Sequence, residues 1–336
     1  MVWAGLGLVA LVCCALLGWM ALAIYFDFSL LGPPWFRATL AILVVGAGLI
    51  VLLFGRSRRW AYVGIAAGFL VALMAWLAIA PSNEGDWQAD VATLPFADIQ
   101  GDRVIVHNVR NAEYRTETDY TVRLEDRVLD LSQLRSLDLF LIHWGSPLIA
   151  HTIMSWGFEG DRYLAISIET RKKKGQDYSA LRGFFRQYEL MFIVADERDV
   201  IRLRTNFRGE EVHVYRLIVS PAGARHLLLR YLEEVNELRD RPQWYNALTD
   251  NCTTAIQRLA RSGERRSWWS WKLFVNGYLD ELAYEIGAID RSLPFLVLKA
   301  KSYINERAKA AGDDPRFSVR IREGLPRMSL NLGDAR

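Results

Sequence analysis

Cys252 is the residue of this sequence best suited to covalent chemistry. It is the only cysteine outside the first apolar segment, and it lies in the polar stretch from Tyr245 to Thr254. Helix-capping residues precede it, and apolar residues at helical spacing follow it up to Gly263. A thiol in the first turn of a helix faces unpaired N–H groups and the positive end of the helix dipole, which favour the nucleophilic thiolate. The alternative is a buried structural cysteine.

A cysteine nucleophile needs a base, and usually a third group that orients the base. The sequence has five histidines. His226 is expected to face outward on a helix, while His107 and His213 fall within expected strands and are more simply explained by packing. His143 and His151 therefore remain as the two candidate bases.

The alternating segment from Tyr163 to Arg171 offers polar partners for such a base. In a strand, Ser167, Glu169 and Arg171 would lie on one face. Glu169 could accept an imidazole N–H, and Arg171 could bind a carboxylate or polarise a carbonyl. The same spacing also fits an exposed strand face with a Glu–Arg pair. The sequence contains no serine elbow, metal-ligand cluster or phosphate-binding glycine loop, so we expect no metal and no cofactor.

The elements that must position these residues are those of an α+β domain. Apolar alternation or continuous apolar runs predict strands at 104–109, 120–124, 137–143, 163–169, 190–195 and 212–219. Helical spacing predicts short helices at 178–188 and 197–204 and a long helix at 221–239. Five or six strands, with helices grouped toward the end of the domain, are typical of the α+β class.

The first 80 residues predict three membrane-spanning helices. The apolar runs cover residues 2–26, 36–54 and 60–80. A cleaved signal peptide is not indicated, because the first run lacks a basic leader and two more spans follow. Three arginines between the second and third runs favour a cytoplasmic loop. We therefore expect a multi-pass protein of the inner (cytoplasmic) membrane, with everything beyond Pro81 on the periplasmic side.

Composition divides the chain into three expected parts. Residues 1–80 form the three-helix transmembrane domain, residues 81–310 an extracytoplasmic domain, and residues 311–336 a loosely ordered tail of Gly, Pro and mixed charge. The net charge of +3 is too small to indicate a nucleic-acid partner. Outside the cytoplasm, an unpaired thiol is a liability unless it reacts or is buried, which strengthens the case for Cys252 as a nucleophile.

Four stretches in this order resemble the periplasmic domain of Lnb-type lipoprotein intramolecular transacylases. They are His151-Thr152, Ile166 to Arg171, Ala195 to Val200, and Tyr245-Asn246 with Asn251 to Thr254. The resemblance covers about residues 135–262. This family is similar to permuted papain-like thiol enzymes of the NlpC class, in which the histidine precedes the cysteine. The resemblance therefore implies an NlpC-like soluble domain and selects His151 over His143.

The resemblance implies acyl transfer on a substrate that stays in the lipid bilayer. In Lnb-type enzymes an acyl chain moves from the glycerol of a diacylated lipoprotein to the α-amine of its own amino-terminal cysteine. Cys252 would attack the ester with His151 as base, and the N–H groups that begin the Cys252 helix would stabilise the oxyanion. The resemblance leaves the third group open, and we expect Glu169. Residues expected near the substrate are Ser167, Arg171, Tyr245 and Asn251.

Two further functions compete with acyl transfer to an amine. A thiol hydrolase of cell-wall peptides would pass the acyl group to water, and a non-catalytic envelope module would keep only the fold. Three membrane spans favour the lipid substrate. The aromatic-basic stretch from Arg265 to Phe274 fits either a lipid-facing surface or core packing of Trp268, Trp269 and Trp271.

Overall fold

The computed structural model describes residues 2–246, 270–273, 275–329 and 331–332. The predicted nucleophile Cys252 and its neighbour Asn251 lie outside these residues, as do Trp268 and Trp269. Two compact units make up the chain. The membrane unit comprises Met1–Ser82, Asp177–Glu189 and Trp244–Asn246, and the sheet unit comprises Asn83–Gln176, Leu190–Gln243 and Ala247–Arg336.

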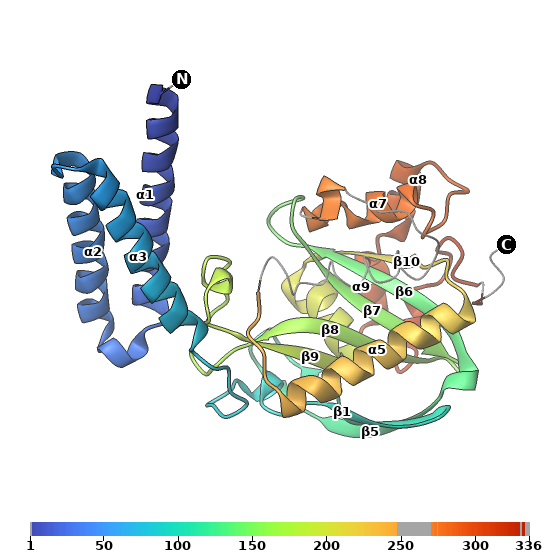
Figure 1. The fold of residues 1–336 in the computed structure, drawn as a ribbon. Coiled ribbons are helices and arrows are strands. Elements are labelled where there is room, and N and C mark those ends of the chain that lie inside the picture. Colours follow the sequence, from blue (N-terminus) through green and yellow to red (C-terminus); the bar gives the residue numbers. More distant parts are fainter. Residues whose placement is uncertain (1, 247–269, 274, 330, 333–336) are drawn as a thin grey trace. The chain divides into compact units, whose positions relative to one another are not determined.

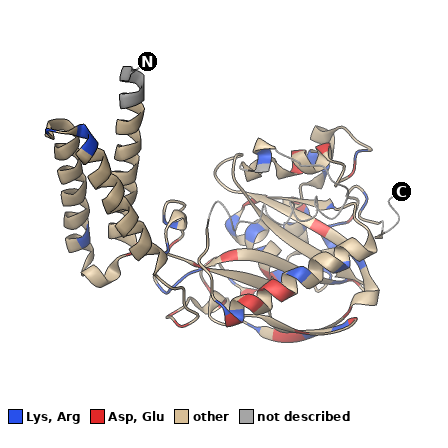
Figure 2. Ribbon diagram, in the orientation of Figure 1, with Lys and Arg blue, Asp and Glu red and all other residues tan. Residues whose placement is uncertain are grey.

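The membrane unit contains three long apolar helices, as the sequence predicted. They are α1 (Val2–Phe26), α2 (Pro34–Phe54) and α3 (Arg58–Leu77). Each is long and apolar enough to cross a membrane. Figure 2 shows how few charged residues these helices carry. The break between α1 and α2 follows from Gly32, whose φ of 131° few other residues adopt, and from Pro34, which supplies the first residue of α2.

The predicted helix at 178–188 is wrong. The segment contains only one short 3-10 turn, Arg182–Phe184. Its side chains instead contact the apolar helices of the same unit: the Phe185 ring lies 5.4 Å from that of Phe26, and the Arg186 guanidinium lies 4.3 Å from the Trp76 ring. Gln187 donates a hydrogen bond of 2.6 Å to Asp27. These contacts override the local helical preference.

The sheet unit is built on one eight-stranded sheet, with the strand order β1-β2-β9-β8-β7-β6-β10 and β5 paired to β2 (Figure 1). Its strands are β1 (Phe96–Gln100), β2 (Arg103–Arg110), β5 (Leu124–Asp130), β6 (Leu134–His143), β7 (Ala150–Phe158), β8 (Arg162–Arg171), β9 (Glu189–Ala195) and β10 (Glu211–Arg216). β6, β7 and β8 form consecutive antiparallel pairs. Two short strands, β3 (Glu113–Tyr114) and β4 (Tyr120–Thr121), pair separately.

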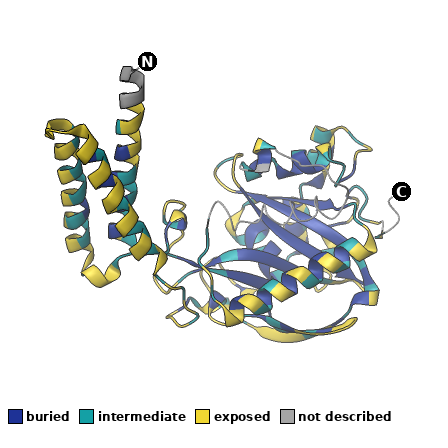
Figure 3. Ribbon diagram, viewed as in Figure 1, coloured by how far each residue is buried: buried dark blue, intermediate teal, exposed yellow. Residues whose placement is uncertain are grey.

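Both faces of the central strands are buried, which explains their continuous apolar sequence. On β6, Leu139 and Leu141 face the cluster that includes α5 (Pro221–Asp240), while Phe140 and Ile142 face the opposite cluster. Figure 3 shows the resulting band of buried residues along these strands, and Figure 1 shows α5 lying across one face. The α5 helix begins where predicted, with the Ser220 hydroxyl accepting from the Gly223 N–H.

The second face is covered by α4 (Glu197–Arg202), α9 (Asn305–Ala311) and α10 (Phe317–Arg320), and a π-helical turn (Leu203–Arg208) follows α4. The helices α7 (Leu279–Glu285) and α8 (Phe295–Ser302) instead pack in the cluster that includes α5. The structure differs here from the loosely ordered tail expected for 311–336. Phe317 and Ile321 are fully buried in the apolar cluster against the sheet. Their apolar area, removed from water, orders the part of this segment around them despite its polar composition.

The predicted α+β class is confirmed: a predominantly antiparallel sheet carries helices on both faces, and three apolar helices precede it. The relation to permuted papain-like enzymes stays a prediction.

Candidate active site

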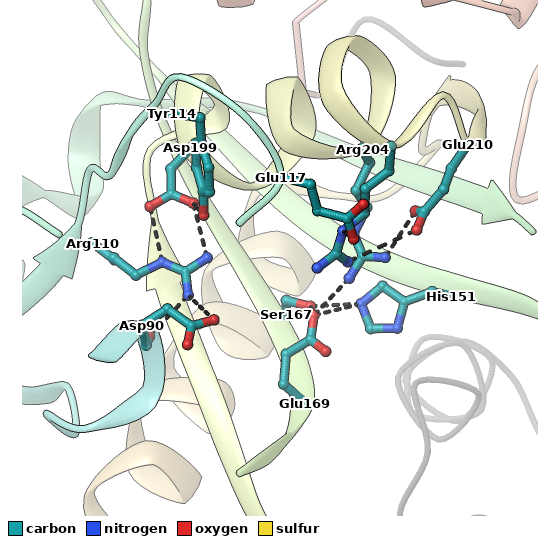
Figure 4. A network of polar contacts seen from close by, with 11 residues as sticks. Asp90, Arg110, Tyr114, Glu117, His151, Ser167, Glu169, Asp199, Arg204 and Glu210 are labelled. Carbon is teal, nitrogen blue, oxygen red and sulfur yellow. Dashed lines mark hydrogen bonds and ion pairs between the residues drawn. The ribbon is translucent and has the colours of Figure 1, made fainter. Parts of the chain in front are cut away.

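His151 lies on β7 with its side chain directed at two polar residues of β8. Ile153 pairs with Ser167 in the antiparallel register, so His151, two residues from Ile153, lies on the same sheet face as Ser167 and Glu169. The imidazole Nε2 is 2.7 Å from the Ser167 Oγ and 3.0 Å from the Glu169 Oε1 (Figure 4). His151, Ser167 and Glu169 were all predicted site residues, and the structure brings them together.

The direction of these hydrogen bonds assigns the two ring nitrogens. The Ser167 hydroxyl donates to the Glu169 Oε1 over 2.7 Å, so its oxygen accepts from the His151 Nε2–H. Glu169, as a carboxylate, also only accepts. Nε2 therefore carries the proton, and Nδ1 is the nitrogen that can take a proton from another group. Ser167 is fully buried, and its hydroxyl links the His151 ring to the Glu169 carboxylate through two hydrogen bonds.

Glu169 is held as a carboxylate by its neighbours. Burial by itself would raise the pKa of Glu169, but attraction to His151 and Arg204, with hydrogen bonds from His151 and Ser167, outweighs it and keeps the pKa well below its ordinary value. The Arg204 Nη2 lies 2.9 Å from the same Oε1. At neutral pH the side chain thus presents a fixed negative charge to the imidazole.

Arg204 and its second partner Glu210 were not predicted. The Arg204 Nη1 lies 2.9 Å from the Glu210 Oε2, so its guanidinium bridges two carboxylates (Figure 4). Arg208 and Glu117 continue the cluster toward solvent. A buried arginine has no local sequence signature, because in the sequence Arg204 resembles any charged residue on the outer face of a helix.

A second buried cluster fixes the helix that precedes Arg204. Asp199 of α4 accepts from the Arg110 guanidinium at 2.8 and 2.9 Å and from the Tyr114 hydroxyl at 3.2 Å (Figure 4). It also accepts from the Ala112 N–H at 2.7 Å. Burial would lower the pKa of Arg110, but Asp199 raises it above its ordinary value. This bidentate pair joins α4 to β2.

The structure places the other predicted site residues elsewhere. Arg171 continues the polar face of β8, but its guanidinium donates to the carbonyls of Val91 and Ala92 and lies 4.3 Å from the Trp87 ring. It therefore anchors the segment that leads into β1. Tyr245 belongs to the membrane unit, where its N–H donates to the Tyr188 carbonyl.

His143, the alternative base, is held by a different partner. Its Nε2 donates to the carbonyl of Gly277 over 3.0 Å. Of the aromatic-basic stretch, Trp271 is largely exposed, so core packing is not its role in this structure. The neighbouring Lys272 pairs with Glu281 and Glu285. Among the residues that the structure describes, no group of three or more His, Cys, Asp or Glu could hold a metal ion.

The region around this site matches one protein family. Residues 120–276 match the family model of the Lnb N-terminal periplasmic domain. The predicted Lnb-type resemblance is confirmed for this part of the chain. The Lnb-type region includes His151, Glu169 and Arg204, as well as position 252. Together with the three apolar helices, it fits a membrane protein that carries a periplasmic domain. Searches of curated proteins and of solved structures give no match.

Proposed function

We propose that the protein is a membrane-anchored thiol acyltransferase, with Cys252 as nucleophile and His151 as base. The observation that carries the proposal is the state of the His151 ring. Its Nε2 lies within hydrogen-bonding distance of Ser167 and Glu169, which orient the ring and stabilise the imidazolium that forms when a base takes the thiol proton. This base–orienter pair is what a thiol nucleophile requires, and the Lnb-type region that contains it also contains Cys252.

In the proposed reaction, the Cys252 thiol gives its proton to the His151 Nδ1, and the thiolate attacks the carbonyl carbon of a lipid ester. The tetrahedral intermediate collapses to a thioester, and the leaving glyceryl oxygen takes the proton back from His151. An amine then attacks the thioester, His151 removes one amine proton, and the thiolate leaves. Glu169 stabilises the imidazolium formed in each half-reaction.

The substrate class follows from the family and from the membrane helices. The Lnb-type match supports a lipoprotein-processing role, and three apolar helices would keep the enzyme beside a substrate that stays in the bilayer. We therefore propose a diacylated lipoprotein or membrane lipid as acyl donor and an amine as acceptor. The acting domain would lie on the periplasmic side of the inner membrane.

The test uses full-length protein in detergent, a diacylated lipopeptide with a free amine, and intact-mass detection. We expect an acyl adduct on Cys252 and movement of one chain to the lipopeptide amine without a change in lipopeptide mass. Cys252→Ala should abolish the adduct, and His151→Gln should slow transfer by about 10²- to 10⁴-fold. His226→Gln, at an exposed position on α5, is the matched control and should transfer at the parental rate.

Other outcomes separate the competing functions. Release of the chain to water would indicate a thiol hydrolase in place of a transferase. No adduct, together with a Cys252 that is inert to thiol reagents, would overturn the nucleophile assignment.

A further inference from the structure

We propose that Arg204 is a positioning residue of this site. It holds the Glu169 carboxylate beside His151 and keeps that carboxylate ionised. The inference rests on the proposed function, because the imidazole that Glu169 orients is the proposed base. It adds a residue that neither the sequence motifs nor the family match identifies.

Arg204 contacts Glu169 on the same oxygen that faces the imidazole. Glu169 Oε1 lies 2.9 Å from the Arg204 Nη2, 3.0 Å from the His151 Nε2 and 2.7 Å from the Ser167 Oγ. The Arg204 side chain is 11% exposed, so its ion pair is poorly screened by water. A charge-assisted bond from a buried guanidinium fixes the carboxylate more strongly than a neutral donor would.

In the proposed reaction, the ion pair between Arg204 and Glu169 has a role in addition to stabilising the fold. During a transacylation the imidazole must alternate between a neutral and a charged form. When His151 is neutral, it no longer compensates the negative charge of Glu169, which burial disfavours. Arginine stays protonated throughout. Arg204 would therefore keep Glu169 ionised in both states, so that the carboxylate is ready each time the ring takes up a proton.

The backbone around Arg204 directs its guanidinium toward the two carboxylates. Arg204 lies in the π-helical turn Leu203–Arg208, and such turns frequently occur at functional sites. Gly209 ends the turn with a φ of 65°, in the left-handed region that favours glycine. The chain then reverses, and the Glu210 N–H donates to the Arg204 carbonyl over 2.9 Å. Glu210 thus holds Arg204 by backbone and by side chain.

The test compares three variants of the full-length protein in detergent. Arg204→Gln removes the charge, and Arg204→Lys keeps the charge but loses the planar fork. Arg208→Gln is the matched control, because Arg208 belongs to the same turn and pairs with Glu117 and, at 3.8 Å, with Glu210, whereas Arg204 pairs with Glu169.

The main readout is the ring-nitrogen spectrum of His151 in ¹⁵N-histidine-labelled protein, followed from pH 8 to about pH 2, because strongly hydrogen-bonded carboxylates titrate that low. The charged and polar groups that face Glu169 are His151, Ser167 and Arg204, and Arg204 also faces Glu210. Because Glu169 Oε1 contacts the His151 Nε2, protonation of Glu169 should change the Nε2 signal. In Arg204→Gln the pH at which this perturbation occurs should rise by at least about one unit, a tenfold change in proton affinity. Arg204→Lys should show a smaller rise, and Arg208→Gln none. Thermal denaturation first shows that each variant is folded, because unfolding would itself return the pKa of Glu169 to its ordinary range.

The rate of Cys252 alkylation against pH gives a second, independent readout. In Arg204→Gln, the pH at which the alkylation rate falls on the acid side should rise together with the midpoint of the His151 perturbation. An unmoved midpoint in both Arg204 variants, or an equal movement in Arg208→Gln, would overturn the positioning role. If Arg204→Gln does not fold, Arg204→Lys decides alone. A Cys252 that is inert in the parent, beside a midpoint that moves as expected, would overturn the proposed function and leave the Arg204 assignment standing.

Discussion

At the scale of single residues, His213 is a buried histidine whose charge affects the stability of the fold. It lies on β10, almost fully buried, and its ring centre is 6.0 Å from that of His143 on the neighbouring strand. Burial, with the nearby ammonium of Lys299, lowers the pKa of His213 to about 4. The folded protein therefore holds this imidazole neutral under conditions in which an exposed one would be charged.

The first prediction concerns the pH dependence of this effect. As pH falls through about 6.5, the unfolded chain protonates His213 first, and the folded chain follows only near 4. The free energy of unfolding should therefore fall across this window, by about 3 kcal/mol from this residue. His213→Phe keeps a packed ring and cannot titrate, so its thermal midpoint should fall less than that of the parent between pH 7 and pH 4.5.

The exposed His226 on α5 provides the control for this measurement. His226→Phe should lose stability with falling pH to the same extent as the parent. Parallel curves for the parent and His213→Phe would show that His213 does not carry the effect.

At the scale of elements, the connection between β6 and β7 is clamped by a short turn from much later in the sequence. The side chain of Asn276 bonds both the N–H and the carbonyl of Ala150, the residue before His151, at 2.9 and 2.6 Å. The next residue, Gly277, donates its N–H to the Leu148 carbonyl. The position of the candidate base therefore depends on a turn about 126 residues away in the chain.

The second prediction tests this clamp. A Cβ at Gly277 would lie 2.1 Å from the Pro147 carbonyl oxygen and 2.6 Å from the Leu148 carbonyl carbon, so backbone must move. Gly277→Ala should destabilise the protein by about 1–3 kcal/mol and slow thiol-dependent transfer, as measured by thermal denaturation and by the lipopeptide assay. The control is Gly64→Ala in α3, where an added Cβ meets no atom within 4 Å. Equal effects of the two substitutions would contradict the clamp.

At the scale of the whole molecule, Arg322 ties the end of the sequence to the central sheet. Its guanidinium bonds Glu197 of α4 at 2.6 and 2.7 Å and Asp138 of β6 at 2.9 Å, and it lies 4.1 Å from the Tyr163 ring. Arg216 shares Asp138. Four separate stretches of the chain thus meet at one buried group of charges.

The third prediction follows from the burial of these charges. Arg322→Met should leave Asp138 and Glu197 incompletely compensated and cost about 3–5 kcal/mol. Arg320→Met is the control, because Arg320 forms an exposed ion pair with Asp314 that contributes little to stability. The two variants can be compared by denaturant midpoint. A similar midpoint for both would mean that this charge cluster contributes little.

Much of this architecture could be predicted from the sequence because it is recorded in local patterns. Alternation placed Ser167 and Glu169 on one face of a strand, and the structure has them on the same face of β8. The three apolar helices and the long helix α5 were likewise predicted from composition and helical spacing, since each pattern reflects the element's own burial.

The remainder depends on partners that are distant in sequence. Arg204 and Arg322 look like surface residues until the carboxylates that surround them are known. Arg171 follows the same strand alternation as Glu169, yet it meets the carbonyls of Val91 and Ala92 because another segment crosses there. Spacing identifies a face of a strand. It does not identify what lies against that face.

The hairpin of β7 and β8 also sets an order of assembly for the proposed site. His151, Ser167 and Glu169 become neighbours as soon as this hairpin pairs, an event that takes on the order of microseconds in small hairpins. In the proposed site, Cys252 follows later in the chain and would arrive by a long loop closure, which is slower. During the folding of a newly exported chain, the acceptor of the thiol proton would thus be built before the thiol reaches it. Until then the cysteine would remain an ordinary, weakly reactive thiol.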